Sequence, residues 1–139
     1  MKRLAAAALL LLAACGVRDG AVAPPAAACA PGLAPGTVTT LFFGLSRPNR
    51  PDVAEADWQD FLSREIMTRM AGATVVDGRG LFRAPGAAPA AEPARVVVLG
   101  HRGGAGTERA LSEIAEHYKR RFDQWGVGRT DTAACTNFE

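Results

Sequence analysis

Several polar residues of this sequence lie at or near the ends of predicted strands and helices. Brought together, such side chains would form a polar pocket with a proton donor. Glu65 and Arg69 lie one helical turn apart, so the carboxylate either acts as an acid or base or simply pairs with the arginine. The predicted strand order does not bring the whole set together, and we assign no catalytic residue. The candidate pocket residues are Arg47, Glu65, Arg69, Arg79, His101 and Tyr118.

A glycine-rich loop at residues 100–107 separates an apolar run from a helical pattern. Backbone amides at a helix start attract anions, so a phosphate site is one interpretation. Neither the Walker pattern nor the dinucleotide fingerprint fits, because no lysine precedes Thr107 and the glycines are misplaced. The alternative is a flexible turn with an exposed His101. Neither His101 nor His117 has the spacing of a metal or haem ligand, so we expect no metal and no cofactor.

The first residues have the layout of an export signal. Met1-Lys2-Arg3 is basic, residues 4–14 are all leucine and alanine, and Cys15 follows. Residues 12–15, Leu-Ala-Ala-Cys, resemble the lipobox of bacterial lipoproteins, in which the signal is cut before the cysteine and the cysteine is acylated. The resemblance implies a lipoprotein signal peptide over residues 1–14 and a lipid, such as palmitate, on Cys15. The alternative is an ordinary signal peptide that contains a cysteine.

This reading predicts an exported protein that a lipid anchor holds at the periplasmic face of the cell envelope. Gly16 follows the cysteine where an aspartate would resemble an inner-membrane retention signal, which favours the outer membrane. With Cys15 assigned to lipid, Cys29 and Cys135 remain as an even pair in an oxidising compartment, and we expect a disulfide between them. Two free thiols are the alternative.

Two short apolar runs predict the central strands of a sheet. Residues 96–99 are Val-Val-Val-Leu and residues 41–43 are Leu-Phe-Phe, which suits strands in the middle of a sheet. Residues 74–77, continued at 81–83 after a glycine-containing bulge, predict an edge strand. Residues 127–131 predict the other edge, and residues 84–93 an alanine-proline loop.

Apolar residues at spacings of three and four predict two helices. The first begins at Asp52, which with Glu55 resembles a capping box. Its apolar side carries Trp58, Phe61, Leu62, Ile66 and Met70. The apolar side of the second helix carries Leu111, Ile114, Ala115, Tyr118, Phe122 and Trp125.

The order strand, helix, strand, strand, helix, strand predicts an α+β, ferredoxin-like βαββαβ fold. We expect a four-stranded antiparallel sheet with both helices on one face, so that the other face has no helix of its own. Residues 15–35 are rich in alanine and proline and should form a flexible tether, and residues 36–139 should form the domain.

The order and spacing of several short segments resemble a bacterial family of small exported, often lipid-anchored proteins, the domain-of-unknown-function family 3574. The match covers nearly all of residues 29–138, and the glycine-rich loop after His101 departs from the family pattern. The resemblance implies the domain but no activity. The matching segments are Leu41-Phe42-Phe43-Gly44-Leu45-Ser46, Trp58 with Phe61-Leu62 and Glu65, Thr74-Val75-Val76-Asp77, Tyr118-Lys119 with Arg121-Phe122, Arg129 with Asp131, and Cys135.

The formal net charge is only +2, and no basic run is longer than residues 119–121, which gives no electrostatic case for nucleic acid, so we expect no nucleic-acid partner. Two function classes remain. We expect a non-catalytic, lipid-tethered envelope module whose uncovered sheet face pairs with a second copy or an envelope protein. The alternative is a small enzyme or ligand-binding protein with a pocket on the open sheet face of a dimeric α+β barrel.

Overall fold

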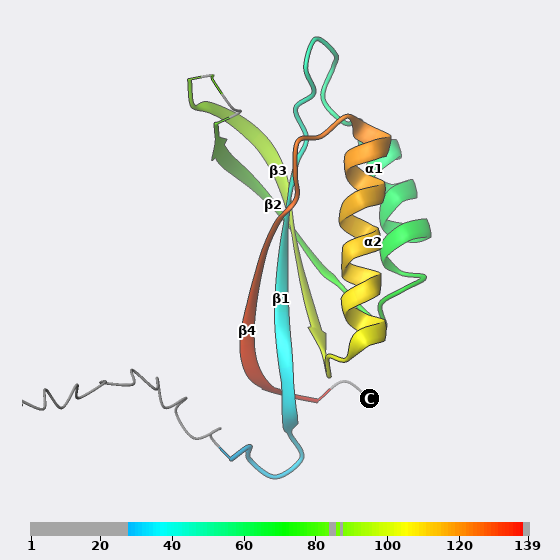
Figure 1. Cartoon of the computed structure of the whole chain (residues 1–139), viewed down its shortest axis with the longest axis vertical. Coiled ribbons are helices and arrows are strands. Elements are labelled where there is room, and N and C mark those ends of the chain that lie inside the picture. The colour runs from blue at the N-terminus through cyan, green and yellow to red at the C-terminus, as the bar shows by residue number, and fades with distance from the viewer. Residues whose placement is uncertain (1–27, 84–85, 87, 138–139) are drawn as a thin grey trace, which may run out of the picture.

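The computed structural model describes residues 28–83, 86 and 88–137. The strands form one four-stranded antiparallel sheet in the order β2-β3-β1-β4. The helices lie side by side on one face of it (Figure 1). This arrangement confirms the predicted ferredoxin-like fold. The predicted signal peptide, Cys15 and residues 16–27 of the predicted tether lie outside the described residues.

The two apolar runs form the centre of the sheet, as predicted. β1 spans Ala34–Gly44 and β3 spans Ala90–His101, and they pair antiparallel. β2, Thr74–Phe82, pairs with the outer side of β3, and β4, Gly128–Thr136, pairs with the outer side of β1. Side chains alternate between the two faces, so Phe43 is 0% exposed beneath the helices and its neighbour Phe42 is 43% exposed.

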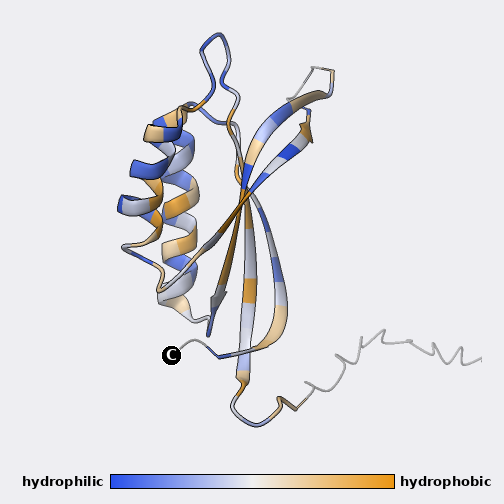
Figure 2. Cartoon of the chain, turned by 180° about the vertical axis from the view of Figure 1, so that it is seen from behind, coloured by the Kyte–Doolittle hydropathy of each residue, from blue (hydrophilic) through white to orange (hydrophobic). Residues whose placement is uncertain are grey.

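The helix layer packs its apolar sides on the central strands. α1 spans Glu55–Phe61 and continues as a π-helical turn, η1, at Leu62–Ile66, and α2 spans Ala105–Phe122. Figure 2 shows hydrophobic residues at intervals along the helices and through the central strands. The Phe43 ring lies edge-on to Tyr118, with centroids 4.7 Å apart, and to Trp58 at 5.4 Å. Among the described residues, no helix is long and apolar enough to span a bilayer.

Helix α1 begins later than the capping pattern predicts. Its N-cap is Ala54, which makes no side-chain capping hydrogen bond. The predicted capping box at Asp52 is therefore wrong. The physical reason is Val53, which is buried and whose backbone N–H donates to the Leu45 carbonyl at 2.8 Å. This contact holds the chain extended past Asp52, and only then can the helix start.

The β2–β3 hairpin is longer than predicted. β2 runs without a break through Gly78-Arg79-Gly80, with Arg79 opposite Pro93, so the predicted bulge is wrong. Residues 90–93, predicted as loop, belong to β3. Cross-strand pairing with β2 overrides the weak strand preference of alanine, glycine and proline here. The end of the hairpin bends away from the helices (Figure 1).

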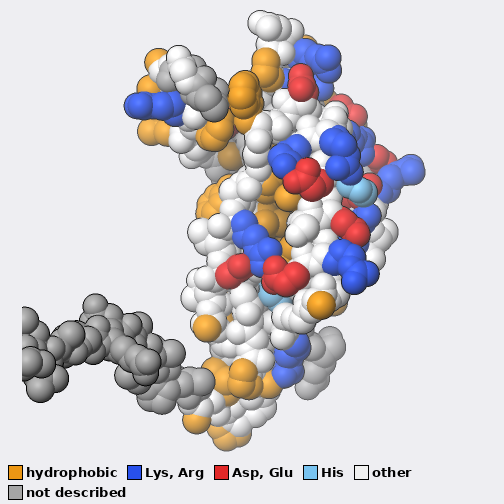
Figure 3. All heavy atoms as spheres, viewed as in Figure 1, with side chains coloured by type: hydrophobic (Ala, Val, Ile, Leu, Met, Phe, Trp, Pro, Cys, Tyr) orange, Lys and Arg blue, Asp and Glu red, His pale blue; other side chains and the backbone are white. Residues whose placement is uncertain are grey.

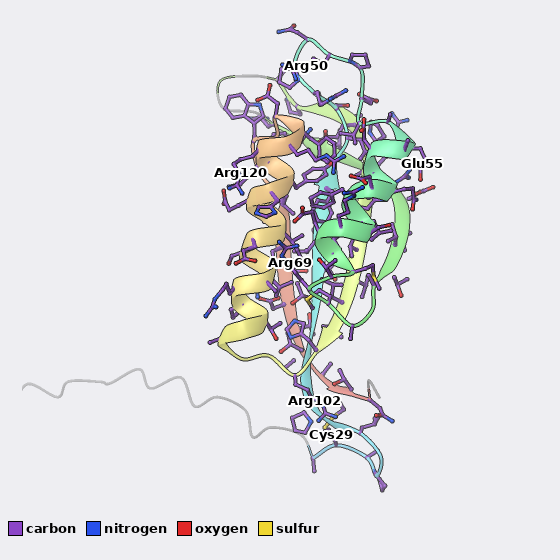
Figure 4. All side chains as sticks on the ribbon, turned by 90° about the vertical axis from the view of Figure 1, so that its right-hand side faces the viewer. Cys29, Arg50, Glu55, Arg69, Arg102 and Arg120 are labelled. Atoms are coloured by element: carbon purple, nitrogen blue, oxygen red, sulfur yellow. A yellow bond between two sulfur atoms is a disulfide. The ribbon has the colours of Figure 1, made fainter. Side chains whose placement is uncertain are left out.

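Cys29 and Cys135, the expected pair, are joined by a disulfide with Cα atoms 5.5 Å apart. The bond spans a sequence separation of 106 residues. It ties the segment before β1 to the end of β4, where Pro35 and Cys135 are register partners. Figure 4 shows Cys29 at the end of the sheet where the described chain begins.

Replacing both Cys29 and Cys135 with serine should lower the free energy of unfolding by about 4 to 5 kcal/mol, because the unfolded chain regains the entropy of a long loop. Urea denaturation without reductant measures the difference. The wild type in reductant should unfold at the same urea concentration as the double variant. Equal stability of the oxidised wild type and the double variant would contradict the disulfide.

Candidate functional site on the uncovered sheet face

A groove of about 890 Å³ lies on the sheet face that the helices leave uncovered. Its walls come from the end of β1, the β2–β3 hairpin, the loop after β1 and the loop before β4. Figure 3 shows hydrophobic side chains gathered on the hairpin, which stands apart from the rest of the molecule. A groove of this volume falls within the range of small-molecule sites.

Strand alternation and small residues together create the groove. Because Phe43 faces the helices, Phe42 and Gly44 face the opposite side, with their register partners Val96 and Ala94. A Cβ added to Gly128 would lie 3.2 Å from the Phe42 side chain, so this glycine makes room for the ring. The small residues that hollow the face are Gly44, Gly78, Gly80, Ala90, Ala94, Gly126 and Gly128.

Aromatic side chains form much of the groove wall. Phe42, Phe82 and Trp125 line it and are all well exposed. We predicted Trp125 on the buried side of the second helix, which is wrong, because its side chain is 61% exposed. Asp123 adopts a left-handed conformation, with φ of 56°, and ends α2 after Phe122. The chain then turns outward and carries Trp125 to the groove.

The two loops at the mouth of the groove are linked. The Gln124 side-chain amide donates to the Ser46 carbonyl at 2.7 Å, which fixes the loop before β4 against the loop after β1. Arg47 lines the same mouth. Its Nε donates to the Pro51 carbonyl at 2.7 Å, which keeps the guanidinium in its own loop. Side chains from distant parts of the sequence are thus positioned around one opening.

Glu92 is the acidic residue of the groove lining, and the sequence analysis did not select it. Its carboxylate lies directly over Gly44, where an added Cβ would come within 2.6 Å of Oε2. Burial raises the pKa of the Glu92 carboxyl above its ordinary value. The charge of Asp52 raises this pKa further, whereas the hydrogen bond from the Ser46 backbone N–H lowers it. A half-buried carboxyl group beside a groove is a candidate acid or base.

Arg47 and Arg79 are the predicted pocket residues that line the groove. Arg47 comes from the loop after β1 and Arg79 from the edge strand β2, so the fold brings together two positive charges from separate elements. They flank a lining that contains one carboxylate, that of Glu92. The groove can therefore hold a ligand that carries both signs of charge.

Glu65 and Arg69 lie in the helix layer, apart from the groove. Their side chains form an ion pair of 2.9 Å, and Glu65 also contacts His117 Nδ1 at 2.5 Å. The hydrogen bond with His117 lowers the pKa of Glu65, and burial opposes it. Figure 4 shows Arg69 between α2 and the α1–η1 segment. The sequence allowed Glu65 either to act as an acid or base or to pair with Arg69. The structure shows the ion pair.

Tyr118 reaches the groove only through the backbone. Its ring is wholly buried in the core, and its hydroxyl donates to the Gly44 carbonyl at 2.8 Å. Burial raises the pKa of Tyr118, and the nearby charge of Glu92 raises it further. The hydroxyl therefore fixes the end of β1 beneath the groove and keeps its proton.

His101 lies at the opposite end of β3 from the groove. The exposed histidine expected there is wrong, because His101 is buried and its Nε2 lies 2.8 Å from Thr39 Oγ1. The Gly103 N–H donates to Nδ1 at 3.1 Å, so Nε2 carries the proton. The Thr39 hydroxyl in turn donates to Asp131 at 2.5 Å, which links β3, β1 and β4. In the described part of the chain, no group of three or more acidic, histidine or cysteine residues could hold a metal ion.

The fold and the groove define a small ferredoxin-like α+β domain with a ligand-sized groove on its uncovered sheet face. Residues 38–138 match the family described as protein of unknown function (DUF3574), and the chain belongs to that family. This confirms the family resemblance of the sequence. No curated protein matches the chain.

Two solved structures share the fold at low sequence identity. Phage SAM lyase in complex with S-methyl-5′-thioadenosine has a TM-score of 0.59 and 14% identity, over 74% of this chain and 90% of that chain. Phage SAM lyase in the apo state has a TM-score of 0.52 and 17% identity, over 78% of this chain and 92% of that chain.

These neighbours correct the expected function. We expected a non-catalytic envelope module, but the two solved structures above, which share the fold, are those of an enzyme. The expected module would use the uncovered sheet face as a surface for a protein partner. That face instead carries a groove of the size of a small-molecule site. The findings favour the alternative, a small enzyme or ligand-binding protein with its pocket on the open sheet face.

Replacing Glu92 with glutamine tests whether burial of this carboxylate destabilises the folded protein. A raised pKa means that the folded chain binds the proton more tightly than the unfolded chain. Below the pKa of the unfolded chain the carboxyl group is protonated and does not lower the stability of the wild type. Above the pKa of the folded chain it is ionised and lowers that stability by its full amount. The melting temperature of Glu92→Gln, relative to wild type, should rise from about pH 4 to about pH 8.

Glu116→Gln is the matched control, because Lys119 lowers the pKa of that exposed carboxylate on α2. Its stability relative to wild type should stay level or fall over the same pH range. A fall in the relative stability of Glu92→Gln with rising pH would show that the carboxylate is well paired in the folded protein, contrary to this account.

Proposed function

We propose that the protein is a small enzyme that binds an adenosyl sulfur compound in the groove of its uncovered sheet face. The observation that carries the proposal is the groove itself, with aromatic walls and a half-buried carboxylate, on a fold shared with phage SAM lyase. S-methyl-5′-thioadenosine, the compound bound in one of those structures, is an uncharged ligand of this class.

The groove chemistry suits such a ligand. An adenine ring and a thioether are largely apolar, and the faces of Phe42, Phe82 and Trp125 offer stacking surfaces for them. A methionine-derived tail would add an amino acid carboxylate, for which Arg79 provides positive charge. Arg47, which its own loop holds at the mouth, adds to the positive charge there. Both halves of the ligand therefore find matching side chains in one groove.

Binding of S-methyl-5′-thioadenosine tests the site. Isothermal titration calorimetry should detect binding to the purified protein, and Trp125→Ala should weaken it about tenfold, in the range of one lost base–aromatic stack. Met67→Ala is the control, because Met67 is a comparably exposed apolar side chain outside the groove lining. Equal losses in both variants, or no binding to the wild type, would contradict the proposed site.

Turnover tests the enzymatic part of the proposal. Incubation with S-adenosylmethionine should release S-methyl-5′-thioadenosine faster than buffer alone, as followed by chromatography. The bond between sulfur and the amino acid tail breaks, and the tail's own carboxylate oxygen bonds to the same carbon, so that the tail leaves as a lactone. Trp125→Ala should slow the release and Met67→Ala should not. Binding of the ligands without any turnover would overturn the enzyme and leave a binding protein.

We also propose that the protein is exported and anchored through a lipid on Cys15, which the basic start, the apolar run and the lipobox-like segment support. The groove lies at the far end of β1 from Cys29, so a tether entering at Cys29 would leave the opening turned away from the anchored end.

Cys15→Ala tests the anchor. In a bacterial host, wild type should incorporate a palmitate analogue and fractionate with membranes, whereas Cys15→Ala should do neither. Cys29→Ser, which removes a different cysteine, should keep the label. Labelling of Cys15→Ala equal to wild type would contradict lipidation at this residue.

A further inference from the structure

Glu92 is placed on the floor of the groove by the strands beneath it. Gly44 and Ala94 are register partners on the uncovered face, and Glu92 lies two residues before Ala94 on the same side of β3. Its carboxylate folds back over Gly44, so close that a Cβ there would touch both oxygens, at 2.6 and 2.7 Å. A residue with a side chain at position 44 would push the carboxylate away.

The carboxylate has no cationic partner within the described chain. None of the ion pairs among the described residues includes Glu92. Arg47, in the same lining, directs its guanidinium to the backbone carbonyls of Pro51 and Asp52, at 2.7 and 3.3 Å. The Ser46 backbone N–H donates a hydrogen bond to this carboxylate, but it is a neutral donor and leaves the charge itself without a partner. Half-buried carboxylates are normally paired with a cation, because burial removes the hydration of the charge.

The surroundings of this carboxylate favour a diffuse cation over a small hydrated one. Phe42 and Val96 are register partners on the same face, and Trp125 also lines the groove. Aromatic faces attract cations that carry methyl groups, and an apolar wall strengthens the attraction of a carboxylate for them. The sulfonium centre of S-adenosylmethionine carries a methyl group and a formal positive charge.

We propose that Glu92 recognises the sulfonium charge, so that the groove binds S-adenosylmethionine in preference to the uncharged thioether S-adenosylhomocysteine. This inference rests on the proposed adenosyl ligand. The two compounds share the adenosine, the amino group and the carboxylate, and differ only in the methyl group and its charge. S-methyl-5′-thioadenosine lacks the charge and the amino acid part, and its binding does not depend on Glu92.

The test compares the three ligands by calorimetry, in short titrations whose ligand is checked for cleavage by chromatography. Wild type should bind S-adenosylmethionine about tenfold more tightly than S-adenosylhomocysteine, which is the difference in affinity that one modest charge interaction produces. Glu92→Gln should abolish this preference and leave the affinity for S-methyl-5′-thioadenosine unchanged. Glu116→Gln, which removes the same charge from the outside of α2, should keep the preference.

Gly44→Ala is the second variant, because it retains the Glu92 charge and displaces the carboxylate. It should reduce the preference for the sulfonium compound while the protein stays folded, as circular dichroism would verify. An unchanged preference in either Glu92→Gln or Gly44→Ala would overturn the role of Glu92.

The outcomes separate this inference from the proposed function. If no adenosyl compound binds the wild type, the proposed function fails. If all three bind the wild type and the two amino acid-bearing ligands bind equally tightly, the sulfonium preference fails and the proposed function stands. If Glu92→Gln weakens both of these ligands equally, the carboxylate pairs with the amino group, which also overturns the inference.

Discussion

The burial of Phe43 under both helices fixes how the rest of the sheet is arranged. Its ring packs edge-on against Trp58, Phe61 and Tyr118 and is fully buried. Because side chains alternate along a strand, this one contact turns Phe42 and Gly44 to the uncovered face. A shift of the register by one residue would turn Phe42 and Gly44 into the core and would expose Leu41 and Phe43 on the uncovered face. The groove exists because that shift is prevented.

Most of the fold could be predicted because its strongest elements carry strong patterns. The apolar runs at residues 41–43 and 96–99 suit only central strands, and α2 buries Leu111, Ile114 and Tyr118 at helical spacing. The edges were less predictable. The start of β3 consists of alanine, glutamate and proline, which have little strand preference, and only its partners in β2 make it a strand.

The candidate site was mostly missed for the same reason. Glu92 stands in an alanine-proline segment that reads as a loop, although a single acidic residue in such a segment was the available signal. Trp125 fits the helical spacing of α2, and only the left-handed conformation of Asp123 removes it from that helix. His101 and Arg79 both lie near strand ends, but at opposite ends of their sheet. Strand-end position alone does not say which end of a sheet a residue occupies.

The groove is built at some expense of stability. The chain keeps small residues where larger ones would pack the face, and it holds a half-buried carboxylate without a cationic side-chain partner among the described ion pairs. The face covered by the helices differs, because it has a densely packed aromatic core and paired charges such as Glu65 with Arg69. A folded domain that fills one face and hollows the other has a face available for a ligand.

The most direct measurement of the central claim is a nuclear magnetic resonance titration of the isotope-labelled protein with S-methyl-5′-thioadenosine. We predict that the backbone amide signals that shift belong to the end of β1, the β2–β3 hairpin and residues 124–128, which surround the groove. Shifts confined to the outer sides of the helices, around Glu65 and His117, would contradict it.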